Sequence, residues 1–231
     1  MASHSKPNSR PLRRHDLIYV SSAAWRSLLA TCSDLAADPL VAQSLVESWV
    51  DNGWPLIGRR AMPHEVRGVA LGLPLPPFAG KRRLSFLMRP EDIVSTAPPP
   101  ALGFAGRVAP RAWRPTLDAI DALASQYRAE ARVFGSLAWR ALTGLNYLAD
   151  RSDLNLLLHV HRDTDLLRLA ADLAAIEATA PMRLDGELIR DDGAAVNWRE
   201  FHAGVREILV KSVGGVALLD TSLFLSATVP S

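Results

Sequence analysis

The chain has 231 residues, of which 48% are hydrophobic and 22% charged, and its formal net charge is +2. This composition excludes a wholly disordered chain, and no apolar run approaches the roughly 20 residues that cross a bilayer. A single cysteine, Cys32, excludes an internal disulfide, and the polar, basic residues 1–14 lack the apolar stretch of a secretory signal. Net charge is small, with no basic stripe carrying interleaved aromatics, which disfavours nucleic-acid binding. We therefore expect a cytoplasmic globular protein without membrane or nucleic-acid partners.

The first half of the chain predicts a smaller α+β domain over residues 1–97, with about the first 14 residues flexible. Apolar residues at three- and four-residue spacing indicate a helix near residues 41–50, and residues 84–88 indicate a short strand after a proline-rich patch. A triple proline followed by small residues and glycines then predicts a linker over residues 98–111. The remaining residues, 112–231, form the second predicted domain.

The second domain alternates helical and strand patterns. Residues 116–132 carry a helical apolar stripe behind Pro115, and helical character resumes over residues 137–142. Residues 154–160, with the sequence LNLLLHV, indicate a buried strand, after which Asp163 is expected to cap a helix. Residues 182–190 and 205–210 are further strand candidates. This order predicts an α+β domain with a mixed sheet and flanking helices.

The motif with chemical content is Gly135-Ser136, followed after a short gap by Asp153 and Asn155. Glycine and serine between a strand and a helix place backbone N–H groups and a hydroxyl at a helix N-terminus, where phosphate binds well. Positions 153 and 155 share a strand face, because strand side chains alternate. Two oxygen-bearing side chains beside a phosphate site can hold Mg²⁺ or Mn²⁺ against a polyphosphate.

Gly-Ser, a spacer and then Ser-Asp-x-Asp-Leu is typical of the nucleotidyltransferase fold, and this chain resembles that pattern. More narrowly, GSLAWRALTGLNYLADRSDLNLLLHV, together with RLDGEL, NWREF and ILVKS downstream, resembles the malonate decarboxylase holo-acyl-carrier-protein synthases, or phosphoribosyl-dephospho-CoA transferases. RRHDLIYV and GLPLPPFAGKRRLSF fit the same family, so the resemblance covers most of the chain.

The resemblance implies a transfer reaction. The donor is 2′-(5″-triphosphoribosyl)-3′-dephospho-CoA, and the acceptor is a serine on the apo acyl-carrier subunit of malonate decarboxylase. The serine hydroxyl attacks the α-phosphorus and pyrophosphate leaves, with Mg²⁺ or Mn²⁺ as the cofactor. Asp153, Asn155 and Asp185 are the implied catalytic residues and metal ligands.

Asn155 departs from the family pattern, which has aspartate at this position. An amide oxygen still coordinates a metal, but it brings no charge and cannot act as a base. We therefore expect a chain that binds donor and turns over poorly. Two alternatives stay open: another nucleotidyltransferase, such as the citrate lyase counterpart, or a catalytically degenerate protein that binds a nucleotide or the carrier.

The third carboxylate is expected on a neighbouring strand, from Asp185 or Glu187. These residues are two apart and share a face, so spacing does not separate them; Asp185 is favoured, and Glu187 is kept as a further metal-ligand candidate. Lys211 is a candidate phosphate ligand, with a solvent-exposed strand-end lysine as the alternative. Lys81 and Arg82 are candidates for the donor phosphates, with a solvated basic turn as the alternative.

Overall fold

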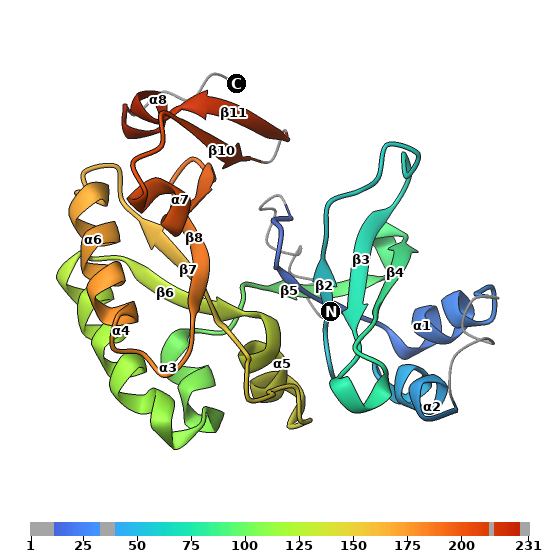
Figure 1. Cartoon of the computed structure of the whole chain (residues 1–231). Coiled ribbons are helices and arrows are strands. Elements are labelled where there is room, and N and C mark those ends of the chain that lie inside the picture. Colours follow the sequence, from blue (N-terminus) through green and yellow to red (C-terminus); the bar gives the residue numbers. More distant parts are fainter. Residues whose placement is uncertain (1–11, 33–39, 213–214, 227–231) are drawn as a thin grey trace, which may run out of the picture. The chain divides into compact units, whose positions relative to one another are not determined.

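The computed structural model describes residues 12–32, 40–212 and 215–226, and it divides the chain into two compact units (Figure 1). The first unit comprises Met1–Pro99 and the second Pro100–Ser231. The prediction of a flexible start falls mainly on residues 1–11, which lie outside the described residues.

The first unit is built on an antiparallel five-stranded sheet with the strand order β4-β3-β2-β1-β5. Its strands are β1 (Leu17–Val20), β2 (Leu56–Gly58), β3 (Val69–Pro74), β4 (Arg83–Met88) and β5 (Ile93–Ala97). Its helices are α1 (Ser22–Leu29) and α2 (Leu40–Ser48), with short 3-10 turns η2 (Pro77–Ala79) and η3 (Pro90–Asp92). The helix expected near residues 41–50 and the strand expected at 84–88 correspond to α2 and β4.

Two buried tryptophans hold the first unit together. The indole Nε1 of Trp25 donates to the carbonyl oxygen of Val46 at 2.9 Å, and its ring meets Phe86 edge-on with centroids 4.9 Å apart. The indole of Trp49 likewise donates to the carbonyl oxygen of Pro55 at 2.9 Å. Each ring therefore buries a large apolar area while its one polar group is satisfied.

The second unit carries a six-stranded sheet with the order β11-β10-β9-β8-β7-β6. Its strands are β6 (Glu130–Phe134), β7 (Leu154–Val160), β8 (Leu184–Arg190), β9 (Ala195–Asn197), β10 (Glu207–Lys211) and β11 (Val216–Asp220). Its helical segments are α3 (Leu102–Ala105), η4 (Gly106–Val108), η5 (Arg111–Trp113), α4 (Arg114–Gln126), α5 (Gly135–Thr143), α6 (Leu166–Glu177), α7 (Trp198–His202) and α8 (Thr221–Leu225). β7 and β8 are parallel and the other pairs antiparallel, which confirms the predicted α+β class with a mixed sheet.

Side-chain alternation gives this sheet two unlike faces. Leu156 and Leu158 of β7 pack in one apolar cluster with Ile120 of α4 and Leu169 of α6, and these two helices lie against each other (Figure 1). The odd-numbered residues of β7 and β8 must therefore project from the opposite face. That face carries the polar residues expected to form the site.

Two local expectations in the second unit are wrong. The helix predicted over residues 116–132 ends at Gln126, because Arg128 adopts a left-handed conformation (φ 53°) and Glu130–Phe134 pairs with β7 as β6. The helix cap expected at Asp163 is made by Asp165, whose side chain accepts the backbone N–H of Arg168 at 3.0 Å.

Most of the segment expected to be a linker, residues 98–111, belongs to the second unit, which begins at Pro100. It contains α3, and the side chains of Leu102 and Ala105 are 2% and 0% exposed in that unit's apolar core. The backbone N–H of Val133 in β6 also donates to the carbonyl oxygen of Pro100 at 2.9 Å. Small apolar residues among the prolines thus bury against the sheet, so the segment is ordered structure. Within the described ranges, no helix combines the length and apolar character needed to cross a membrane.

Candidate active site

The end of β6 and the beginnings of β7 and β8 meet at one edge of the sheet in the second unit. Phe134, the last residue of β6, is the register partner of Asn155, the second residue of β7. Asn155 is in turn the register partner of Asp185, the second residue of β8. Three neighbouring strands therefore bring the Gly135-Ser136 turn, Asn155 and Asp185 to the same place, although 50 positions separate the first from the last.

Gly135 and Asn155 fit closely together. Gly135 has φ +69°, and a Cβ added to it would lie 2.6 Å from Nδ2 of Asn155, well inside van der Waals contact. Nδ2 of Asn155 also donates to the backbone carbonyl of Asp153 at 3.3 Å. Only glycine satisfies both the left-handed backbone and the space that the Asn155 amide occupies.

Helix α5 begins at this position without a side-chain cap. Phe134 is the N-cap residue, its backbone is extended, and its apolar side chain makes no capping hydrogen bond. The first N–H groups of a helix have no partner within the helix, and the helix dipole adds positive potential there. The start of α5, including the half-buried Ser136, therefore suits an anionic oxygen such as a phosphate.

Asp185 is held by two hydrogen bonds to the same carboxylate oxygen. Its Oδ1 accepts the backbone N–H of Gly186 at 2.9 Å and the side-chain Nδ2 of Asn197 at 3.1 Å. Asn197 ends β9 and was not among the residues that the sequence singled out. Its signal in the sequence is an N-cap pattern, Asn followed three residues later by Glu200, but that pattern does not reveal the contact with Asp185.

Glu187 is engaged by Lys211 on the same face of the sheet. Nζ of Lys211 lies 2.7 Å from Oε1 of Glu187, and the two side chains are 27% and 7% exposed. Ala195 is the β9 partner of Lys211, and β9 also pairs with β8, so the Lys211–Glu187 contact joins the two strands that flank β9. A buried carboxylate is favourable only when it is paired, so Glu187 holds the ammonium group in place.

Of the remaining predicted residues, Asp153 lies directly before β7 and is half-buried, two positions before Asn155. Lys81 and Arg82 are exposed in the turn between η2 and β4, where Lys81 has φ +52°. These two residues belong to the first unit, and their assignment to donor binding stays a prediction.

The side chains at this edge offer oxygen donors that match the preferences of Mg²⁺. Asp153 and Asp185 supply carboxylates and Asn155 an amide oxygen, which are hard ligands. Within the part of the chain that the structure describes, no three His, Cys, Asp or Glu side chains form a metal-binding group by themselves. Mg²⁺ at phosphoryl-transfer sites is commonly held by one or two carboxylates together with substrate phosphates. The donor set therefore fits a metal that binds with its polyphosphate.

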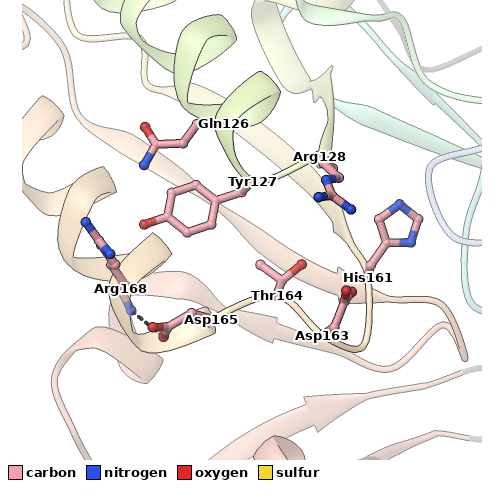
Figure 2. Close-up of a pocket in the computed structure, with 8 residues that line it drawn as sticks. All are labelled: Gln126, Tyr127, Arg128, His161, Asp163, Thr164, Asp165 and Arg168. Carbon is pink, nitrogen blue, oxygen red and sulfur yellow. Dashed lines mark hydrogen bonds between the residues drawn. The ribbon is translucent and has the colours of Figure 1, made fainter.

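A separate pocket of about 510 Å³ lies at the far end of β7 (Figure 2). His161, which follows the last residue of β7, and Arg128 line it together with Asp165 and Arg168 at the start of α6. Tyr127, also in the lining, donates its hydroxyl to Oδ2 of Asp172 at 2.6 Å. Burial, reinforced by that hydrogen bond, raises the pKa of Tyr127 to about 12. The lining contains none of the predicted site residues, and β7 separates it from Asn155 by about 20 Å.

Comparison with known proteins places this arrangement in a family. The family model described as phosphoribosyl-dephospho-CoA transferase MdcG N-terminal domain matches residues 13–99, and the corresponding C-terminal domain matches residues 101–222. A phosphoribosyl-dephospho-CoA transferase of Bradyrhizobium diazoefficiens is 53% identical over the whole length of both chains. One from Xanthomonas campestris pv. campestris (strain 8004) is 37% identical over 79% of this chain and 87% of its own. One from Xanthomonas axonopodis pv. citri is 32% identical over 93% of this chain and 97% of its own.

The two matched domains define a two-domain transferase. The chain belongs to the phosphoribosyl-dephospho-CoA transferase family, which confirms the resemblance found in the sequence. No solved structure matches the chain. The roles of the individual site residues stay predictions.

Proposed function

We propose that this chain transfers the 5″-phosphoribosyl-3′-dephospho-CoA group from 2′-(5″-triphosphoribosyl)-3′-dephospho-CoA to a serine of the apo acyl-carrier subunit of malonate decarboxylase. The serine oxygen forms a bond to the α-phosphorus, the bond from that phosphorus to the β-phosphate oxygen breaks, and the serine proton and pyrophosphate leave. The observation that carries the proposal is the uncapped start of α5 against Asn155, directly beside Asp185. The names of the relatives supply the dephospho-CoA chemistry.

Each residue at this edge has a separate task in the proposed reaction. The N–H groups at the start of α5 and the hydroxyl of Ser136 bind and orient the phosphates of the donor. Lys211, held by Glu187, offers its ammonium N–H groups to the phosphates on the same face. Asp153, Asp185 and the amide oxygen of Asn155 would hold Mg²⁺ or Mn²⁺, which when bound neutralises the charge of the triphosphate.

The contacts of Asp185 and Glu187 support different parts for these two carboxylates, which spacing alone could not separate. Asp185 lies level with Asn155, whereas Glu187 is paired with Lys211. We therefore propose Asp185 as the third carboxylate and Glu187 as the residue that positions Lys211. A metal at Glu187 would have to displace the lysine from a carboxylate that is 7% exposed.

Asn155 lowers the activity in this proposal without preventing donor binding. Aspartate and asparagine are nearly the same size, so the fit against Gly135 is kept, but the site has one negative charge fewer for the metal. Converting Asn155 to aspartate should raise the rate of carrier loading by on the order of 10- to 100-fold, the range typical for groups that support a bound metal.

A paired loading assay tests the proposal. The unaltered chain and Asn155→Asp are each mixed with donor, Mg²⁺ and the apo carrier subunit, and the carrier mass is followed. Asn146→Asp is the matched control, because Asn146 is exposed, its Oδ1 accepts from Arg140 at 3.2 Å, and aspartate keeps that acceptor. We expect Asn155→Asp alone to accelerate loading.

The other outcomes separate the alternatives. Equal loading by all three chains would place the metal elsewhere and refute the role of position 155. Loading of the citrate lyase carrier instead would keep the reaction and change the acceptor. Donor binding without loading by any chain would favour a nucleotide- or carrier-binding protein, a reading that the missing carboxylate at Asn155 supports.

A further inference from the structure

The side-chain amide of Asn197 makes two kinds of contact: its oxygen caps α7, and its nitrogen donates to Asp185. Asn197 is the N-cap residue of α7, and its Oδ1 accepts the backbone N–H groups of Arg199 at 2.9 Å and Glu200 at 3.4 Å. Its Nδ2 donates to Oδ1 of Asp185 at 3.1 Å. The orientation of this amide is thus set by its hydrogen bonds, since a flip would turn the oxygen toward a carboxylate and leave two N–H groups without an acceptor.

The backbone around Asp185 is fixed by neighbouring residues. The backbone N–H of Leu184 donates to Oε1 of Glu177 at 2.8 Å, and its carbonyl accepts from Nε of Arg199 at 2.9 Å. Arg199 and Glu177 also form an ion pair. Trp198 and Phe201 of α7 are buried in the core of the second unit, at 2% and 1% exposure. These contacts hold the backbone on either side of the Asn197–Asp185 hydrogen bond in place.

Both hydrogen bonds to the carboxylate of Asp185 use the same oxygen. Gly186 and Asn197 donate to Oδ1, and among the described residues no hydrogen bond reaches Oδ2. A carboxylate fixed through one oxygen presents the other to a ligand, and such supporting hydrogen bonds orient and tune metal-binding carboxylates.

We propose that Asn197 is a positioning residue that holds Asp185 for a divalent cation on the face shared with Asn155. The inference rests on the proposed function, since it names what organises the metal ligands of that site. It assigns to Asn197 a role besides capping α7, and the two roles can be separated experimentally because they use opposite ends of the amide.

The variant that separates them is Asn197→Ser. Serine caps helices about as well as asparagine, so α7 keeps its N-terminal acceptor. The serine side chain has a hydroxyl in place of the carboxamide, and it is too short to donate a hydrogen bond to Asp185. Mn²⁺ serves as the probe, with inorganic tripolyphosphate present, and its binding is followed by the loss of the electron paramagnetic resonance signal of the free ion.

We expect Asn197→Ser to weaken Mn²⁺ binding by on the order of 10- to 100-fold while the melting temperature stays within about 2 °C of the unaltered chain. In the Asp185→Ala background, Asn197→Ser should have no further effect on Mn²⁺ binding, because the carboxylate through which Asn197 acts is absent. Asn197→Ala, which removes the cap as well, should lower the melting temperature. This variant measures how much the cap of α7 contributes to stability.

Several results would overturn the inference. These are Mn²⁺ binding unaffected by Asn197→Ser, an equal loss in the Asp185→Ala background, or no Mn²⁺ binding by the unaltered chain. A loss of Mn²⁺ binding that only parallels a fall in melting temperature would show a merely structural role. The carrier-loading assay is independent: metal binding that depends on Asn197 without any loading would refute the proposed function and leave this inference intact.

Discussion

Replacing Gly135 by alanine is the most direct perturbation of the proposed site. The added Cβ would lie 2.6 Å from Nδ2 and 3.1 Å from Cγ of Asn155, and the backbone at this position has φ +69°. Two costs follow. The left-handed backbone costs about 1–2 kcal/mol for a residue with a Cβ. The close contact also forces the Asn155 amide outward by roughly 1 Å, toward the ordinary carbon–nitrogen separation of about 3.5 Å.

The two costs predict different observables. A loss of about 1–2 kcal/mol in the second unit should lower its melting temperature by roughly 4–8 °C. A displacement of about 1 Å at a group that positions the reaction should lower the rate of carrier loading by on the order of 100-fold. Thermal unfolding followed by circular dichroism and the loading assay measure the two effects separately.

Gly144 at the other end of α5 provides the matched control. It has φ +74°, and a Cβ there would meet nothing within 4 Å. Gly144→Ala should therefore carry the same backbone penalty and a similar fall in melting temperature, but leave the loading rate almost unchanged. If Gly135→Ala loses no more activity than Gly144→Ala, the packing of Asn155 against the start of α5 has no part in catalysis.

Two further predictions concern stability. Asp165→Ala should destabilise the second unit by about 1 kcal/mol because it removes the cap of α6. Asp163→Ala should change the free energy of unfolding by less than about 0.5 kcal/mol. Equal effects of the two variants in thermal unfolding would contradict the assignment of the cap. In the first unit, the hydrogen bond from Arg59, with one from the backbone of Met62, lowers the pKa of Glu65 from 4.5 to about 2. The stabilisation by ionised Glu65 is present above pH 4.5 and lost as the pH falls toward 2, so the melting-temperature deficit of Glu65→Gln should be largest near neutral pH and shrink through this window; a deficit independent of pH would refute it.

The elements that the sequence predicted well have local signals. Five of the seven residues of β7 are apolar, and the strand has the bounds expected from this largely apolar segment. The helix predicted through residue 132 fails because its apolar stripe continues to Tyr127 while the backbone reverses at Arg128, an arginine with φ 53°. The residue type at position 128 gives no indication of a left-handed turn. Asp163 and Asp165 are equally suitable residue types for the N-cap of α6. Only the path of the folded backbone determines which of the two caps the helix.

The candidate site residues also divide into those with a local sequence signal and those that only tertiary structure brings together. Gly135, Ser136 and Asn155 were recognisable because their motif is compact in sequence. Asp185 and Glu187 share a face, so no spacing could rank them. The proposal of Asp185 rests on tertiary structure: Asp185 is the register partner of Asn155, and Glu187 pairs with Lys211, 24 positions away. Asn197 was missed because its contact with Asp185 is tertiary, whereas its sequence signal describes only the start of α7.

The charge balance of the site explains why position 155 should matter. Glu187 carries a negative charge, but Lys211 at 2.7 Å neutralises it, so this carboxylate adds little negative potential for a metal. Asp153 and Asp185 then remain as the charged ligands that we propose, enough to balance one divalent cation. A second cation, or firmer binding of the first against a highly charged triphosphate, requires another carboxylate on the same face. Position 155 lies level with Asp185 and directly beside the start of α5, so it is where a third carboxylate would act on both metal and phosphate.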